Sequence, residues 1–218
     1  MTDRESRVRT AILRRALLGR DAAVPALAGG TGLTPAEVRA ALAALHDAGA
    51  VYLRDGAVAA AYPLSLVPTG HRVTIGAVTV YANCAVDALA VPPMTGAAAE
   101  IASACGHCQT PILVTMQGDR LLGSEPAAPV VFHLAKDCCA PGPAVLTRCP
   151  HIQFFCGGGH AALWQRAHPE HRGTTFELTD AAAYARRHFV EIIDAVRRDA
   201  TPAGATRYQE QEPKEPAT

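Results

Sequence analysis

Apolar residues recur at helical spacing in the first fifty residues of the chain. The clearest segment starts at Thr34, which can cap a helix, with Pro35 at the first helical position and Glu37 completing a capping box. Gly49 is a natural stop for this helix. The apolar side chains that fall on one of its faces are Val38, Ala41, Leu42 and Leu45. The pattern therefore predicts an amphipathic helix that ends just before Gly49.

Two earlier helices and a hairpin complete the N-terminal pattern. The hairpin is indicated by an Asp55-Gly56 turn between two short apolar runs. The expected elements are helices at about 6–18 and 22–28 and strands at 51–54 and 57–62. Three helices followed by a hairpin are typical of a winged helix, which we predict for residues 1–64.

After Pro63 the pattern changes to the alternation typical of strands. Strands are expected at 71–80, as one strand or a hairpin, at 112–116 and at 130–134. The later helices are expected at 160–167 and from Asp180 to Arg198, the second capped by Thr179 and carrying the apolar stripe Phe189, Ile192, Ile193 and Val196. The chain is therefore predicted to be an α+β protein.

The pattern divides the chain into three parts. The winged-helix-like region is followed by a mixed, strand-rich domain at 65–200 that ends in a C-terminal helix. From Thr201 the composition turns to Pro, Glu, Gln, Lys and Thr, which bury too little apolar surface to offset the entropy of ordering. We expect residues 201–218 to be a disordered tail.

Charge and hydropathy narrow the classes of partner. Lys plus Arg and Asp plus Glu both total 20, which removes the simplest electrostatic argument for a nucleic-acid or membrane partner. In a winged helix that binds DNA, the recognition helix would be the one that begins at Pro35. It offers only one arginine among its polar side chains, which are Glu37, Arg39, His46 and Asp47. The first thirty residues contain no apolar run long enough for a signal peptide or a membrane span. We therefore expect a cytoplasmic protein that binds a small partner.

The seven cysteines point to metal or thiol chemistry, because an odd number in a reducing compartment argues against a disulfide framework. In YANCAVDAL, Asn83 can cap a helix and Cys84 is expected in its first turn, where the helix dipole would lower the thiol pKa. Asp87 lies on the same face, where burial would raise its pKa and the dipole would lower it. The alternative is that Cys84 is a small buried hydrophobe and Asp87 a carboxylate favoured by the dipole.

The CGHC segment at Cys105 and Cys108 has the spacing of one half of a structural zinc site. The residues considered for the two further ligands are Cys138, Cys139, Cys149, His107 and His151. No second C-x-x-C motif follows, so zinc at Cys105 and Cys108 is not the favoured expectation. A thioredoxin-like role is weaker, since no parallel strand–helix unit surrounds the motif. Cys156 opens the run Gly157–Gly159, which we interpret as a flexible turn.

Three features follow one another along the chain: Cys84-x-x-Asp87 after a strand, Cys105 about twenty residues later, and Cys149 leading into HIQFF. With the winged-helix-like region, this pattern resembles the bacterial organomercurial lyases, also called alkylmercury lyases. The resemblance runs from about residue 33 to residue 198 and is most specific in YANCAVDALAVPPMTG and CPHIQFF.

The resemblance implies protonolysis of a carbon–mercury bond to a hydrocarbon and Hg(II), with no organic cofactor required. Cys84 and Asp87 match the family's first catalytic cysteine and its proton-handling aspartate, and Cys149 matches its second cysteine. Soft thiolates select soft metals, so the residues suit mercury on independent grounds. The bound Hg(II) would pass to small thiols or to a mercuric reductase. Cys105 matches a cysteine that the family uses structurally.

The sequence also departs from the family pattern. Asn83 stands where members commonly have an aromatic residue, and Pro150 stands where many have a second adjacent cysteine. The pair Cys138-Cys139 competes with Cys149 for the role of second thiolate. Two other interpretations stay open, a winged-helix metal-responsive DNA-binding regulator and a non-catalytic relative that binds metal through its thiols.

Overall fold

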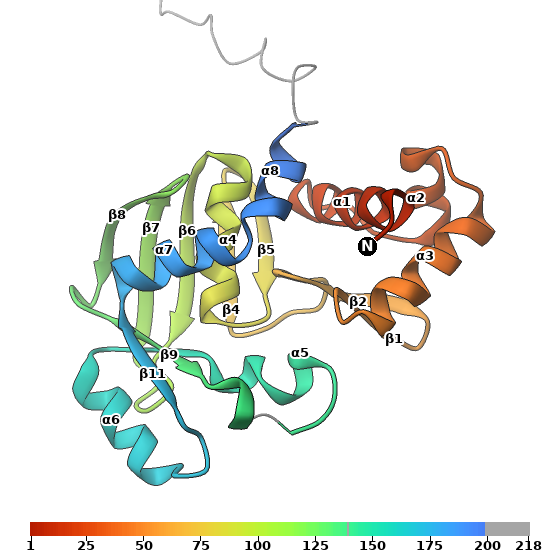
Figure 1. The fold of residues 1–218 in the computed structure, drawn as a ribbon. Helices are drawn as coiled ribbons and strands as arrows, with labels where there is room; N and C mark the ends of the chain where they lie inside the picture. Colours follow the sequence, from red (N-terminus) through yellow and green to blue (C-terminus); the bar gives the residue numbers. More distant parts are fainter. Residues whose placement is uncertain (139, 199–218) are drawn as a thin grey trace, which may run out of the picture.

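The computed structural model describes residues 1–138 and 140–198. The expected disordered tail at 201–218 and Cys139 lie outside the described residues. Helices and an extensive antiparallel sheet are combined in the described part, so the predicted α+β class is confirmed (Figure 1). Within this part, no helix has the length and apolar character needed to cross a membrane.

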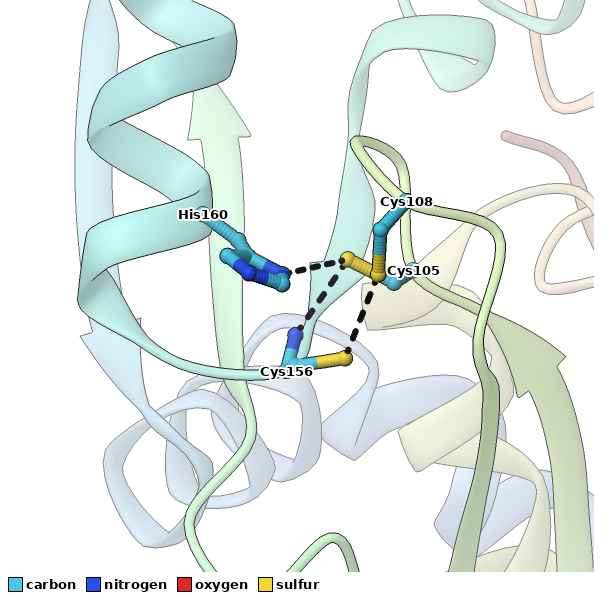
Figure 2. A group of neighbouring side chains, drawn as sticks. All are labelled: Cys105, Cys108, Cys156 and His160. Carbon is cyan, nitrogen blue, oxygen red and sulfur yellow. Dashed lines mark hydrogen bonds between the residues drawn. The ribbon is translucent and has the colours of Figure 1, made fainter.

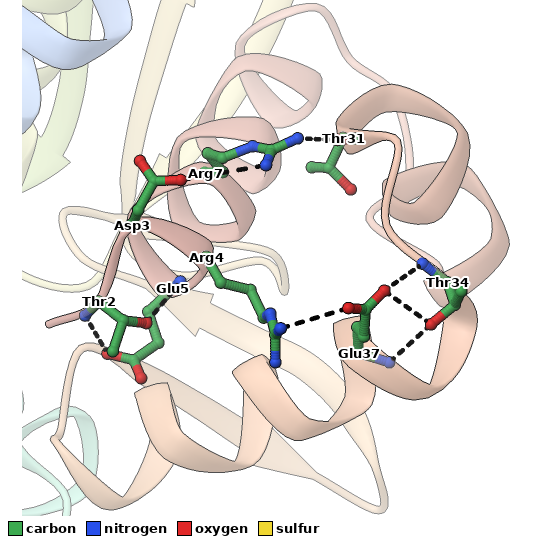
Figure 3. Close-up of polar contacts among 8 residues, drawn as sticks. All are labelled: Thr2, Asp3, Arg4, Glu5, Arg7, Thr31, Thr34 and Glu37. Carbon is green, nitrogen blue, oxygen red and sulfur yellow. Dashed lines mark hydrogen bonds and ion pairs between the residues drawn. The ribbon is translucent and has the colours of Figure 1, made fainter.

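Three helices open the chain, at positions close to those predicted. They are α1 (Asp3–Leu17), α2 (Val24–Thr31) and α3 (Pro35–Asp47). Figure 3 shows the expected capping box, in which the Glu37 backbone N–H donates to the Thr34 hydroxyl oxygen and the Glu37 carboxylate accepts from the Thr34 backbone N–H. Arg4 of α1 lies 3.2 Å from the same carboxylate and links the two helices.

The main sheet begins with the N-terminal hairpin and continues through the rest of the chain. The hairpin consists of β1 (Val51–Arg54) and β2 (Ala57–Ala61). The following strands are β3 (Leu64–Ser65), β4 (His71–Ile75), β5 (Val78–Ala82), β6 (Ala98–Ala104), β7 (Pro111–Gln117) and β8 (Arg120–Glu125), in the spatial order β1-β2-β3-β5-β4-β6-β7-β8. Because β3 pairs with both β2 and β5, the hairpin is part of one eight-stranded antiparallel sheet.

A second, three-stranded sheet carries the later part of the chain. Its spatial order is β10-β9-β11, with β9 (Val130–Leu134) in the centre and β10 (Gln153–Phe155) and β11 (Gly173–Glu177) on either side. Short helical turns η1 (Lys136–Cys138), α5 (Ala144–Thr147) and η2 (Cys149–His151) lie between β9 and β10. The helix α6 (Gly158–Ala167) follows β10, so Gly158 and Gly159 are helical and not the flexible turn that we expected.

The helix α4 (Ala85–Thr95) forms the centre of the fold, and ten of its residues, Ala85 to Met94, are buried. A helix that is apolar all round needs cover on every side. The main sheet provides one side, and α7 (Leu178–His188) and α8 (Val190–Arg198) provide others (Figure 1). The start of α4 is therefore held inside the protein, between the two sheets and the last helices.

The prediction of one long C-terminal helix is wrong. The chain forms α7 and α8, which are separated at Phe189, and the N-cap of α7 is Glu177 and not Thr179. Phe189 leaves the helical conformation, with φ −106° and ψ 14°, while its side chain stays buried. The break lets α8 bury Ile192, Ile193 and Val196 against α4 and α1.

Candidate active site

Cys84 lies two residues after β5, at the N-cap position of α4 and not in its first turn, so the expected cap at Asn83 is wrong. Its backbone is extended, and its Sγ atom accepts a hydrogen bond of 3.4 Å from the Asp87 backbone N–H. The thiol thus takes the place that a serine or aspartate oxygen usually has at a helix start. Asp87 follows in the first turn, on the face of Cys84, as the spacing predicted.

Cys149 lies beside Cys84 and Asp87, although it belongs to a segment about sixty-five residues later in the sequence. It begins η2, and the carbonyl of Ile152 accepts a hydrogen bond of 3.1 Å from the Ala85 backbone N–H. This bond satisfies one of the free N–H groups at the start of α4. It also fixes the segment that carries Cys149 against the end of the helix that carries Cys84 and Asp87.

The structure therefore brings Cys84, Asp87 and Cys149 together. The two sulfurs and a carboxylate oxygen all lie within 4.8 Å of one another. The exposed fractions are 2% for Cys84, 4% for Asp87 and 5% for Cys149. Of the rival pair Cys138-Cys139, only Cys138 is described; it joins no such group among the described residues, and its Sγ lies 4.0 Å from Asp137 Oδ1.

A cavity of about 540 Å³ opens onto these three side chains. The N-terminal region contributes Arg9, Ala50 and Tyr62 to its wall, and the junction of α7 and α8 contributes Phe189 and Val190. The N-terminal region therefore encloses one side of the site.

Burial decides the protonation of Asp87, which the sequence left open. Desolvation raises the pKa of the Asp87 carboxyl from its ordinary 3.8 to about 7. Hydrogen bonds from Asn83 and with Cys84, and the positive charge of Arg148, lower the pKa but do not outweigh burial. The Asn83 Nδ2 donates to Asp87 Oδ2 at 3.2 Å and to the Pro63 carbonyl at 3.1 Å. Asn83 is thus a hydrogen-bond partner of the carboxylate.

The expected lowering of the Cys84 thiol pKa is wrong. Burial raises this pKa well above its ordinary value, and the neighbouring Cys149 thiol and the Asp87 charge add to the effect. The N–H group of Asp87 acts in the opposite direction but is outweighed. Desolvation of a thiolate in a closed apolar setting is larger than the stabilisation that one helix start supplies.

Three residues that line the cavity were not singled out from the sequence. The first is Tyr62, whose hydroxyl accepts a hydrogen bond of 2.7 Å from the Val145 backbone N–H and whose pKa is raised by burial.

The other two residues, Arg148 and His133, lie side by side. Arg148 Nη2 donates to the Leu134 carbonyl at 3.1 Å and lies 3.2 Å from His133 Nε2. Burial and this guanidinium lower the pKa of His133 to about 4, so the imidazole is neutral. Arg148, directly before Cys149, was visible in the sequence as a charge within an apolar motif.

Cys105 and Cys108 lie in a second group, outside this cavity. The other members are Cys156 and His160, and the four ligand atoms all lie within 4.8 Å of one another (Figure 2). None of the partners considered from the sequence takes part in this group among the described residues. His151 stacks on His171 with ring centroids 3.9 Å apart, and Cys149 lies in the first site. The sequence signal for this group is the spacing Cys156-x₃-His160, a Cys–His pair in place of a second C-x-x-C motif.

The fold and the first site together define a class of α+β protein in which two thiols and a carboxyl line one cavity. Two sulfur donors suit a soft metal. The sequence model of the alkylmercury lyases matches residues 64–190, more than half of the chain. An alkylmercury lyase from Streptomyces lividans is 30% identical over 186 residues, which are 85% of this chain and 81% of the relative. One from Pseudomonas putida is 30% identical over 158 residues, 72% of each chain.

The chain belongs to the alkylmercury lyase family. The enzyme class that the sequence predicted is therefore confirmed. The fold agrees, since a crystal structure of the mercury-bound form of MerB2 superposes with a TM-score of 0.77 over 88% of this chain and 93% of that one, at 22% identity.

Proposed function

We propose that the protein cleaves the carbon–mercury bond of organomercurials by protonolysis, with Cys84 and Cys149 binding mercury and Asp87 delivering the proton. The observation that carries the proposal is the buried approach of two sulfurs and one carboxylate oxygen to within 4.8 Å. Family membership supports the type of reaction. The burial and the raised pKa of Asp87 support the roles of the residues.

The reactive free enzyme carries the Cys84 proton on sulfur and a carboxylate at Asp87. The raised pKa keeps the proton on the Cys84 sulfur, and an Asp87 pKa of about 7 leaves about half of the molecules with the carboxylate at pH 7. When the mercury of the substrate binds Cys84, the thiol proton passes to the adjacent carboxylate, and the sulfur–mercury bond forms. Burial then favours the neutral carboxylic acid, which is the form that can donate.

The second thiol prepares the bond for cleavage. The Cys149 sulfur displaces the remaining thiolate or halide of the substrate, and its own proton leaves with that group. Two thiolates donate electron density to mercury, so the attached carbon becomes more basic. Asp87 transfers its proton to this carbon, and the electron pair of the carbon–mercury bond forms the carbon–hydrogen bond. Atoms and charge balance without an organic cofactor, and Hg(II) stays on the two sulfurs.

Product release needs a competing soft ligand, because two thiolates hold Hg(II) tightly. We propose that small thiols or a mercuric reductase accept the ion. The cavity provides the space for such a thiol to approach, since about 540 Å³ lies beside the sulfurs.

The test is the release of hydrocarbon from an organomercurial by purified protein with excess small thiol, measured by gas chromatography of the headspace. Wild type is expected to release one hydrocarbon per Hg(II) formed, and Cys84→Ala and Cys149→Ala are expected to lose activity by at least about a thousandfold. Cys138→Ser, outside both groups, is the matched control and keeps activity. No release from the wild type, or undiminished release from Cys84→Ala, would contradict the proposal.

A further inference from the structure

We propose that Cys105, Cys108, Cys156 and His160 form a resident zinc site of the Cys₃His type, separate from the mercury-binding site. The four residues come from two segments that are distant in the sequence. Cys105 and Cys108 belong to the turn between β6 and β7, while Cys156 follows β10 and His160 lies in the first turn of α6 (Figure 2). A closed set of four protein ligands is typical of structural zinc.

Two distances between ligand atoms match the edges of a zinc tetrahedron. With Zn–S bonds of about 2.3 Å and Zn–N bonds of about 2.0–2.1 Å, such a tetrahedron has S–S edges of about 3.8 Å and S–N edges of about 3.6 Å. The Cys108 and Cys156 sulfurs lie 3.7 Å apart, and Cys105 Sγ lies 3.5 Å from His160 Nδ1. All remaining pairs are within 4.8 Å, so one ion can contact all four atoms after small side-chain movements.

The backbone around the cysteines is arranged as in a metal-binding turn. The Cys156 N–H donates to Cys105 Sγ at 3.4 Å, a bond that stabilises a thiolate. Between the two cysteines, the Gly106 N–H donates to the Phe154 carbonyl at 2.9 Å. A Cβ atom at Gly106 would lie 2.0 Å from the Gln153 side chain and 3.0 Å from the Phe155 ring. A side chain at position 106 would therefore displace the Gln153 amide and press against the Phe155 ring, so glycine allows the close approach of the turn to β10.

Zinc suits this donor set better than the other metals that sulfur binds. Three thiolates and one imidazole in tetrahedral arrangement are the usual structural zinc ligands. The group also lies near the surface, with Cys105 buried, Cys108 exposed and Cys156 and His160 partly buried, so an ion can enter without opening the core.

The ion would fasten the segment that carries Cys149. Cys156 follows β10, and β10 is linked to η2, where Cys149 lies, by only Ile152. The other ligands belong to the turn between β6 and β7 of the main sheet and to α6. Zinc at this position would thus join the main sheet to the segment that brings the second thiol to α4, which makes it a structural metal and not a reactant.

The test is metal analysis of the full chain, expressed with zinc and purified with reductant and without chelator. We expect about one zinc per chain in the wild type and in Cys138→Ser and Cys84→Ser. We expect at least a tenfold loss in Cys108→Ser and in His160→Ala, two changes at positions that are not buried in the core. Cobalt(II) added to metal-free protein is expected to give the visible absorption of tetrahedral thiolate coordination, which Cys108→Ser lacks.

A second measurement keeps the proposal testable if a variant folds poorly. A chelator is expected to lower the wild-type Tm by at least about 5 °C and to leave that of Cys108→Ser unchanged. Wild type that neither contains nor binds added zinc would overturn the proposal, as would zinc retained in both ligand variants. A Cys108–Cys156 disulfide under reducing conditions, or mercury binding there without zinc binding, would also overturn it. Cys84→Ser is inactive under the proposed function but keeps zinc, so the two proposals fail independently.

Discussion

The two cysteine groups of this chain use the same side chain in opposite surroundings. At the start of α4, burial raises the pKa of Cys84 well above its ordinary value. In the turn between β6 and β7, hydrogen bonding with Thr110 lowers the pKa of the exposed Cys108 to about 6. Cys84 therefore keeps its proton until a soft metal replaces it, whereas Cys105 and Cys108 favour the thiolate, and burial together with these two sulfurs raises the pKa of Cys156 to about 12. The difference suits the first group to a reaction that consumes protons and the second to lasting metal binding.

The largest effect that separates the two groups is expected from Asp87→Asn. The amide keeps the shape of the side chain but cannot carry a proton from Cys84 to carbon, so hydrocarbon release should fall by about 10²–10⁴-fold. Mercury binding by the two thiols should remain, and titration with Hg(II) measures it. Asp47→Asn, an exposed carboxylate at the end of α3, is the control and should change neither quantity. Full activity of Asp87→Asn would show that the proton comes from elsewhere.

Stability should depend on pH through the same carboxyl. The folded-state pKa of Asp87 is about 7 and its ordinary value is 3.8, so the folded protein binds this proton more tightly than the unfolded chain. The contribution to stability is complete below about pH 4 and is lost as pH rises to about 7. Relative to Asp87→Asn, the wild-type free energy of unfolding should fall by on the order of 3–4 kcal/mol across this window.

Urea unfolding of both proteins at several pH values between 4 and 8 measures this difference. The pair Asp47→Asn and wild type provides the baseline, because the Asp47 side chain is exposed. A constant difference for Asp87→Asn as well would mean that burial does not raise the Asp87 pKa in the folded protein.

Alkylation rates should show the contrast between the thiols directly. In chelator-treated protein at pH 7, Cys108 is mostly thiolate and exposed, whereas Cys84 is mostly protonated and buried. Iodoacetamide should label Cys108 at least about tenfold faster, even though a thiolate of lower pKa is the weaker nucleophile. Peptide mapping by mass spectrometry gives both rates. Added zinc should slow labelling of Cys108 and not that of Cys84; equal rates at the two sites would remove the contrast.

Local signals in the sequence predicted most of the elements and the approach of Cys84 to Asp87. Capping at Thr34, the Asp55-Gly56 turn and the alternation at 71–80 each correspond to an observed helix or hairpin, because neighbours in the chain determine them. The Cys84-x-x-Asp87 spacing placed two groups on one face of α4. Cys149 could be added only through the resemblance, since its approach depends on the long-range bond between Ala85 and Ile152.

What the sequence did not predict depends on tertiary packing. The break at Phe189 follows from burial of that ring, which helical spacing does not describe. The raised pKa of Cys84 follows from how completely α4 is covered, and no local pattern gives that coverage. The second cysteine group forms because Cys156 and His160 lie beside the CGHC turn. Their position there depends on the packing of β10 against β6, which are distant in the sequence.

The smallest expected effect concerns Asn83, whose amide donates to Asp87 and lowers its pKa. Asn83→Leu keeps a similar volume but removes this donor, so the Asp87 pKa should rise above its present value of about 7. Since the reactive free enzyme needs the carboxylate, the acid limb of the kcat/KM profile should move upward by less than about one pH unit. The lost bond to the Pro63 carbonyl should cost about 1–3 kcal/mol of stability. Gln117→Ala, which removes an exposed amide bond to Gly96, is the control and should leave the limb in place. If the acid limb of the kcat/KM profile does not move in Asn83→Leu, the profile reports the titration of a group other than Asp87.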